Sequence, residues 1–269
     1  MCSWYSIFCV RDSIGSIKGV VDSLLNQSIP PAEINVIDDG STDGTRQILE
    51  DYGDQIKLQY TDNSTRDYSR IPYLWNRCLV KKHFFHMIMA GDVTLEKNYA
   101  EILLNEFEVD SKLVVASGGF GGKTTAPIGA GRMVRQSFSH RYYPKYVEKV
   151  GYESAILFIA LMNGYKINLF PEANMYHHEK LGGGHKFSEW GWSMASLGYH
   201  PLYALGRCAH SFLTDKQVGK MGALNMFWKY LTFKDQGDGY LSYFAPEIRK
   251  SVSDYQIKYM KQKIRGVFI

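Results

Sequence analysis

The sequence predicts an α/β fold in which helices flank a largely parallel sheet. Short apolar, β-prone runs alternate with segments whose apolar residues recur at helical spacing, and this alternation is typical of β-α-β units. The chain has 269 residues, of which 45% are hydrophobic, so it is long enough to bury a substantial core. One large α/β domain, or two small ones, follows from these observations.

The expected elements alternate in chain order. In residues 14–25 the apolar positions recur at helical spacing, and polar residues followed by Pro30 and Pro31 end this first helix. Residues 48–52, 71–79, 99–107 and 156–161 are also predicted to be helical. The predicted strands are Trp4–Val10, Ile34–Ile37, Ile56–Tyr60, Phe84–Met89, Leu113–Ala116 and Lys166–Tyr176.

Charge and composition exclude several classes of protein. The net charge is +4, and residues 216–269 hold ten Lys or Arg against four acids, so the basic excess lies in that segment. Without a base-reading motif, this pattern disfavours a nucleic-acid-binding protein. No apolar stretch reaches the roughly 18 residues of a membrane span, and no signal peptide is recognisable. We therefore expect a cytoplasmic protein whose four cysteines are reduced and packed.

The string VIDDGSTDGT ends the second predicted strand with two adjacent carboxylates, Asp38 and Asp39. In an open parallel sheet, ligands bind beyond the carboxyl ends of the strands. Gly40 and Gly44 permit a tight turn there. A carboxylate at this edge can accept hydrogen bonds from a nucleobase N–H or a ribose hydroxyl. The alternative is that both acids only cap the turn.

Three stretches of the chain carry a resemblance to a known family. The first contains SIFCVRDS and INVIDDGSTDGTRQIL, the second is MAGDVTLEKNYAEILL, and the third is GYESAILFIALMNGYKINLFPEANMYHH. Over residues 5–118 and 150–180 they resemble the family 2 glycosyltransferases, which share the GT-A fold. The resemblance implies a Rossmann-like sheet and transfer of a sugar from a nucleoside-diphosphate sugar to an acceptor hydroxyl. It also implies inversion at the sugar and a divalent ion, Mg²⁺ or Mn²⁺.

The resemblance assigns roles on the donor side. Asp39 corresponds to the acid that contacts the nucleotide base, with Val10, Asp12 and Asp38 in the same donor nucleotide site. Asp92 corresponds to the closing acid of the D-x-D motif, which holds the metal. Ala90, or Gly91 if the alignment shifts by one place, replaces the first acid of that motif, so one of the usual two carboxylates remains. One carboxylate can suffice, because phosphate oxygens and water complete the shell of Mg²⁺ or Mn²⁺.

On the acceptor side, the resemblance makes Glu153 the general base. The family commonly has Glu-Asp there, and this chain has Tyr152-Glu153 at the aligned positions, followed by Ser154. His177 and His178 follow the last predicted strand, where the family often places a metal-ligating histidine. Because neighbouring strand residues point to opposite faces, one of the two should reach the site, and His177 is preferred. A surface histidine pair is the alternative.

A glycine-rich loop at 118–131 leaves a second nucleotide-binding hypothesis open. Residues 117–124 differ from the P-loop pattern at one position, where Ser117 replaces the first glycine. However, Pro127 and the glycines that follow it oppose the helix that a P-loop requires. We instead expect a donor or acceptor loop in which Lys123, Arg132 and Arg135 contact the diphosphate or the acceptor. The incomplete D-x-D motif keeps a third possibility open, a degenerate transferase that binds nucleotide sugar or glycan without turnover.

The last segment predicts a basic, aromatic extension. We divide the chain into a catalytic domain, 1–215, and an extension, 216–269, that packs on it or on a membrane surface. Its apolar residues recur at helical spacing and are Val218, Met221, Leu224, Phe227, Trp228 and Leu231. A basic amphipathic helix can lie in a membrane interface. Such a stripe more commonly packs on the catalytic domain. The hypothesis beside this is a peripheral enzyme on the cytoplasmic membrane face with a glycan or lipid-linked acceptor.

Overall fold

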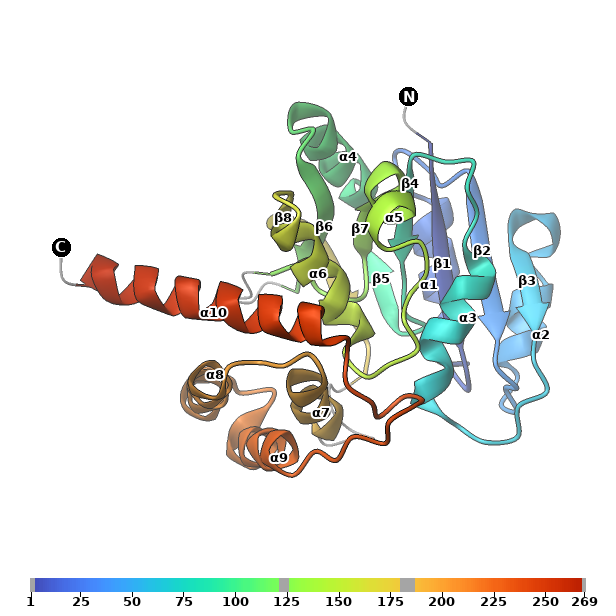
Figure 1. The fold of residues 1–269 in the computed structure, drawn as a ribbon. Helices are drawn as coiled ribbons and strands as arrows, with labels where there is room; N and C mark the ends of the chain where they lie inside the picture. Colours follow the sequence, from blue (N-terminus) through green and yellow to red (C-terminus); the bar gives the residue numbers. More distant parts are fainter. Residues whose placement is uncertain (1–2, 121–125, 180–186, 268–269) are drawn as a thin grey trace. The chain divides into compact units, whose positions relative to one another are not determined.

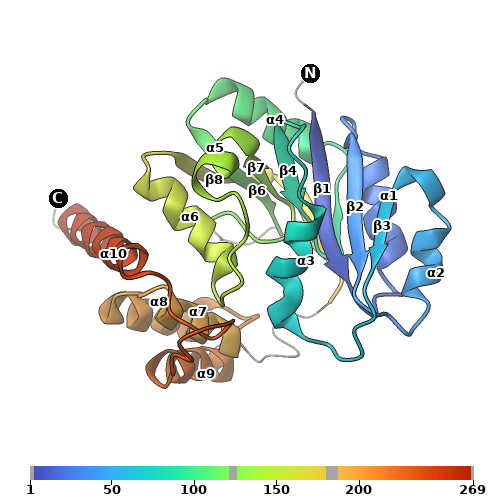
Figure 2. The ribbon, with the colours of Figure 1, turned by 45° about the vertical axis from the view of Figure 1, so that its right-hand side comes forward.

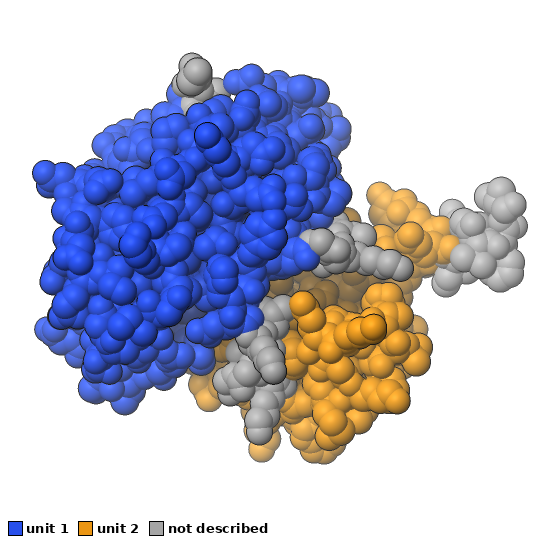
Figure 3. Space-filling view, turned by 180° about the vertical axis from the view of Figure 1, so that it is seen from behind, with its two compact units in different colours: residues 1–146, 163–179 blue, residues 147–162, 180–269 orange. Residues whose placement is uncertain are grey.

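The computed structural model describes residues 3–120, 126–179 and 187–267 (Figure 1). The chain divides into two compact units, which Figure 3 shows in different colours. Unit 1 contains residues 1–146 and 163–179, and unit 2 contains residues 147–162 and 180–269. Unit 1 holds the sheet, and unit 2 is helical. The boundary predicted at residue 215 falls inside unit 2.

Unit 1 is built on an eight-stranded sheet with the order β3-β2-β1-β4-β7-β6-β8-β5. Its strands are β1 Trp4–Val10, β2 Glu33–Asp38, β3 Lys57–Tyr60, β4 Phe85–Ile88, β5 Val93–Leu95, β6 Leu113–Gly119, β7 Arg132–Arg135 and β8 Lys166–His177. The first four strands in the sheet order are parallel, whereas β7 runs antiparallel to both of its neighbours. The predicted α/β class with a largely parallel sheet is thus confirmed.

Helices cover both faces of this sheet (Figures 1 and 2). The helices of unit 1 are α1 Ile17–Leu25, α2 Thr45–Glu50, α3 Ile71–Cys78, α4 Tyr99–Val109 and α5 Gln136–Tyr142. Successive side chains of β1 point to opposite faces of the sheet. Trp4 and Phe8 pack in one core with α1 and α4, whereas the Tyr5 hydroxyl on the other face donates to the carbonyl of Val80, which follows α3. A strand that is buried on both faces reads as the continuous apolar run seen in the sequence.

The strands β5 and β7 were not predicted from the sequence. Two of the four residues of β7 are arginines, and the strand follows a glycine-rich loop, so it lacks the apolar pattern of a buried strand. Burial of Arg132 and partial burial of Arg135 become possible because their guanidinium groups donate to backbone carbonyls. These carbonyls lie outside β7, so the local sequence pattern of the strand does not indicate that its arginines can be buried.

Unit 2 contains five helices within its described residues, and these are α6 Tyr152–Met162, α7 Ser188–Ser196, α8 Pro201–Thr214, α9 Gly219–Leu231 and α10 Pro246–Val267. Helix α9 packs on both α7 and α8. At Gly191 a Cβ atom would lie 2.2 Å from the carbonyl oxygen of Met226, so only glycine allows α7 and α9 to approach this closely. None of the described helices has the length and apolar character needed to cross a bilayer.

Candidate active site

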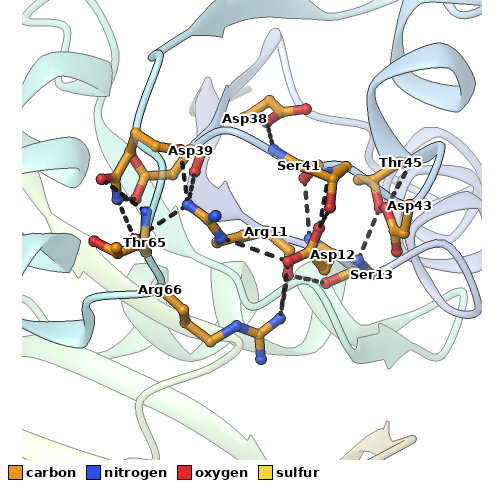
Figure 4. Close-up of polar contacts among 12 residues, drawn as sticks. Arg11, Asp12, Ser13, Asp38, Asp39, Ser41, Asp43, Thr45, Thr65 and Arg66 are labelled. Atoms are coloured by element: carbon orange, nitrogen blue, oxygen red, sulfur yellow. Dashed lines mark hydrogen bonds and ion pairs between the residues drawn. The ribbon is translucent and has the colours of Figure 1, made fainter.

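The carboxyl ends of β1, β2 and β3 bring charged side chains together at one edge of the sheet (Figure 4). Asp39 follows β2, Asp12 follows β1, and the segment that contains Asn63 and Arg70 follows β3. Gly40 has a φ of 79°, and a Cβ atom there would lie 2.1 Å from the carbonyl oxygen of Asn63. The turn after Asp39 therefore requires glycine, for its backbone conformation and for the approach of the neighbouring segment.

The Asp39 carboxylate is held by three side chains. The Arg70 Nη2 donates to Asp39 Oδ1 at 2.9 Å, the Asn63 Nδ2 donates to Oδ2 at 3.0 Å, and the Thr61 hydroxyl donates to Oδ1. Burial raises the pKa of the Asp39 carboxyl, but these hydrogen bonds outweigh it, with the one from Arg70 largest among them, and the pKa lies below its ordinary value. Asp39 is thus an oriented and ionised acceptor at neutral pH.

Asp38 plays a different part from its neighbour. Its side chain is fully buried, Oδ1 accepts from the backbone N–H of Ser41 at 2.7 Å, and Oδ2 lies 3.5 Å from the Nε of Arg46. For Asp38 the turn-capping alternative describes the geometry, because no ligand can reach a side chain with no exposed surface. The geometry therefore assigns Asp38 to the turn and not to the donor nucleotide site.

Residues after β1 join this edge of the sheet. The backbone carbonyl of Val10 accepts from the N–H of Asp39 at 2.9 Å, which fixes the two strand ends together. Asp12 adopts a left-handed φ of 48°, and its Oδ1 accepts from the N–H of Thr42 at 2.8 Å. Arg66 lies 3.8 Å from the other carboxylate oxygen of Asp12. Asp12 thus links the β1 turn to the β2 turn.

Several cations at this edge were not recognised in the sequence. Arg11 donates from Nη1 to the carbonyls of Asp39, Asn63 and Thr65, and it thereby ties the turn after β2 to the segment after β3. Arg66 and Arg70 stand in the string TDNSTRDYSR, which follows β3. Their position directly after the third parallel strand could have identified these arginines, because the carboxyl end of that strand lies beside those of the first two strands.

Asp92 and His177 form a second cluster at the same edge, beyond the carboxyl end of β4. Antiparallel pairing of β5 with β8 places Val93 opposite His177, and the Nε2 of His177 lies 3.3 Å from Asp92 Oδ2. Both side chains are about one-fifth exposed. His178 instead places its Nε2 3.0 Å from the hydroxyl of Thr94. Of the two histidines, His177 is the one that meets Asp92, as alternation along a strand predicts.

The pair Asp92 and His177 fits a divalent metal ion. Adjacent ligands of an octahedral ion with bonds of about 2.1 Å lie roughly 3.0 Å apart, close to the observed separation. The Nδ1 of His177 lies 2.5 Å from the carbonyl oxygen and 3.2 Å from the backbone nitrogen of Glu179, so the backbone holds the ring through Nδ1 while Nε2 faces Asp92. Within the described residues no group of three or more His, Cys, Asp or Glu could hold an ion, so substrate oxygens and water would have to complete the shell.

The two residues before Asp92 contact the core and the end of β1. The side chain of Ala90 packs against the core, where a carboxylate would be desolvated. At Gly91 a Cβ atom would lie 2.9 Å from the Cγ2 of Val10, so a side chain there would press on the end of β1. Asp92 is consequently the acid of this segment that can reach a ligand.

The predicted phosphate-contacting residues are distributed differently from expectation. Arg135 donates to the carbonyls of Leu113 and Phe107 at the amino end of β6, which is the edge of the sheet opposite to Asp39 and Asp92. The structure therefore does not bring Arg135 to the candidate site. Arg132 is buried, and its guanidinium donates to the carbonyls of Pro127 and Ile128, which holds that loop. Lys123 lies outside the described residues.

Glu153 belongs to unit 2, where it stands in the first turn of α6. Its side chain is half-buried, and Tyr152 beside it is buried. An acid in the first helical turn is favoured by the helix dipole, which stabilises the ionised carboxylate that a general base requires.

The sheet and its flanking helices have the GT-A fold, as two solved structures show. A crystal structure of S. aureus TarS 1–349 in complex with UDP-GlcNAc has a TM-score of 0.55 and 17% identity, covering 85% of this chain and 71% of that one. The mannosyltransferase PcManGT from Pyrobaculum calidifontis, in complex with GDP-Man and Mn²⁺, has a TM-score of 0.58 and 14% identity, covering 86% and 72%. At these identities the likeness establishes the fold.

The sequence comparison establishes the family. The model of glycosyl transferase family 2 matches residues 7–166, and the chain belongs to this family. A curated relative, the cholesterol galactosyltransferase of Borreliella burgdorferi, is 29% identical over 115 residues. That alignment covers 41% of this chain and 31% of the relative's length.

Proposed function

We propose that the chain transfers a sugar, with inversion, from a nucleoside-diphosphate sugar to an acceptor hydroxyl, with the help of Mg²⁺ or Mn²⁺. The observation that carries the proposal is the arrangement of an oriented carboxylate, Asp39, and a carboxylate–imidazole pair, Asp92 and His177, at one edge of the sheet. The two clusters offer an acceptor for a base and ligands for the ion on a diphosphate. This is the chemistry that a nucleotide-sugar donor needs.

In this proposal the donor site has a division of labour. Asp39 accepts a hydrogen bond from an N–H of the base, and its bonds to Arg70, Asn63 and Thr61 hold the carboxylate in one orientation. Asp92 and His177 would hold the metal. When bound, that ion neutralises charge on the departing diphosphate. Placing these groups on strand ends and tight turns fixes them before the donor arrives.

Glu153 would act on the acceptor as general base. The acceptor oxygen forms a bond to the anomeric carbon from the face opposite to the diphosphate, and its proton passes to the Glu153 carboxylate. The bond between the anomeric carbon and the diphosphate oxygen breaks, and its electron pair leaves with the diphosphate. Inversion follows from this single displacement. Positioned base catalysis typically contributes ~10²–10⁴-fold in rate.

We further propose a lipid or lipid-linked glycan as the acceptor. The name of the curated relative gives a sterol as the molecule that it galactosylates. A hydroxyl on such a molecule is a weak acid, so its attack on a sugar requires a base of the kind assigned to Glu153.

A screen of donors tests the proposed class directly. We expect one of UDP-, GDP- or dTDP-sugars to raise the thermal unfolding midpoint of the protein in the presence of Mn²⁺, because a ligand that binds only the native state stabilises it. The shift should be smaller when EDTA replaces Mn²⁺. No shift with any of these donors would contradict the proposal, and a shift with ATP alone would favour the P-loop hypothesis.

A further inference from the structure

The outward face of α9 is apolar and unusually exposed. Met221, Leu224, Trp228 and Leu231 follow one another at intervals of three or four residues, so they form one stripe along the helix. Their exposed fractions lie between 53% and 77%. The opposite side of α9 is used in packing, and its buried residues are Ala223 and Met226. One side of α9 thus packs within unit 2, and the exposed stripe on its other side has no packing partner among the described residues.

The sequence grouped two further residues with this stripe, and the structure separates them. Val218 is buried, and Phe227 is half-buried with its ring stacked near that of Tyr230. Both belong to the packed side of the α9 segment. The exposed stripe is thus narrower than the sequence pattern and is formed by long or aromatic side chains.

Helix α8 presents a second apolar face. Leu202, Leu205 and Leu213 are 65%, 47% and 79% exposed, whereas its packed side contains the buried Ala204 and Cys208. The end of α8 lies beside the start of α9, since the Lys220 ammonium sits 5.6 Å from the ring centroid of Phe212. We call the outward apolar faces of these two helices the α8–α9 surface.

The segment that carries the α8–α9 surface has an excess of positive charge. Residues 201–234 contain one acid, Asp215, and five cations, which are Arg207, Lys216, Lys220, Lys229 and Lys234. This excess of four equals the formal net charge of the whole chain, so the remaining residues are neutral in sum. Long lysine side chains can lie along an apolar surface while their ammonium groups reach anionic headgroups. The charge pattern is complementary to an acidic lipid surface.

We propose that the α8–α9 surface docks the protein on an anionic lipid bilayer without spanning it. Leu, Met and Trp side chains enter the headgroup boundary, where a Trp ring finds both apolar and polar surroundings. The lysines contribute electrostatic attraction to anionic lipids. This docking does not depend on the proposed transfer chemistry. It would bring the chain to the surface where a lipid acceptor is found.

Co-sedimentation of the full chain with lipid vesicles tests the proposal. We expect binding to vesicles that contain phosphatidylglycerol, weaker binding at high salt, and little binding to phosphatidylcholine alone. Trp228 is 61% exposed, Trp4 and Trp75 are buried, and Trp190 and Trp192 of α7 are half-buried, so a blue shift of tryptophan emission on binding should be strongly reduced in Trp228→Phe. A protein that remains in the supernatant with anionic vesicles at low salt would overturn the proposal.

Two variants separate the apolar and the electrostatic contributions. Leu224→Ser with Trp228→Ser should lower the partition coefficient on anionic vesicles by at least about tenfold, and Lys216→Glu with Lys220→Glu should have a similar effect that high salt removes. The control is Val109→Ser, which changes an 85% exposed residue of α4 in unit 1. Equal loss in the control would overturn the assignment to the α8–α9 surface.

The same variants distinguish a bilayer from a second copy of the chain. Sedimentation velocity in the absence of lipid is expected to give the same species for the wild type and for Leu224→Ser with Trp228→Ser. A wild-type dimer that this variant dissociates would show that the α8–α9 surface is a self-association interface, and it would overturn lipid docking as its role.

Discussion

Replacing Glu153 with glutamine is expected to lower sugar transfer by at least ~10²-fold while the affinity for the donor changes little. Glutamine keeps the size of the side chain but cannot take a proton from the acceptor hydroxyl. The loss should therefore appear in kcat, and the nucleoside diphosphate should bind with nearly the wild-type dissociation constant. Initial rates of transfer and calorimetric titration of the nucleotide would measure the two quantities.

The matched control for this variant is Glu247→Gln, which changes an exposed acid in the first turn of α10 in the same unit. It should leave the rate unchanged. Full activity of Glu153→Gln would place the general base elsewhere. A wild-type protein that binds a donor but shows neither transfer nor hydrolysis across a broad acceptor panel would instead favour the degenerate, binding-only alternative.

Asp92→Asn is expected to remove the metal-dependent part of donor binding and to lower transfer by about 10²–10³-fold, since a metal is worth several kcal/mol to a departing phosphate. His177→Ala should act in the same direction, because the two side chains face one ion in the proposal. Titration of the nucleoside diphosphate with Mn²⁺ and with EDTA measures the effect. Asp54→Asn, at an exposed acid before β3, is the control.

Asp39→Asn should give a different pattern. This variant keeps the shape of the side chain but loses the charged acceptor, so nucleotide binding should weaken by about 10–100-fold both with and without metal. Because Asp39 also pairs with Arg70, the substitution can change stability, and the unfolding midpoint of the variant must be compared with that of the wild type. If the loss of nucleotide affinity depended on metal to the same extent in the Asp39 and Asp92 variants, the separate roles proposed for the two acids would be contradicted.

Much of the fold could be predicted because its signals are local. The strand predicted at Trp4–Val10 has the same bounds as β1, since a central strand that is buried on both faces is apolar along its whole length. The short β5 and the arginine-bearing β7 gave no such signal. Their pairing depends on β8 and β4, which lie far away in the chain.

The acids of the site were predictable, but their partners were not. Asp39 stands at the end of an apolar strand beside glycine, and this context indicates a ligand edge. Arg70, which orients Asp39, is separated from it by 31 residues, and only the sheet order brings them together. Arg135 shows the converse error, because the antiparallel direction of β7 carries its side chain to the other edge of the sheet.

In the proposed function, a nucleotide sugar lies along the edge of the sheet that joins Asp39 to Asp92. A crystal structure of the protein with Mn²⁺ and the nucleoside diphosphate selected by the donor screen would test it most directly. We expect an anomalous manganese peak within about 2.2 Å of Asp92 Oδ2 and of His177 Nε2, with the base within hydrogen-bonding distance of the Asp39 carboxylate. A nucleotide bound with its base or its manganese away from these residues would contradict the account.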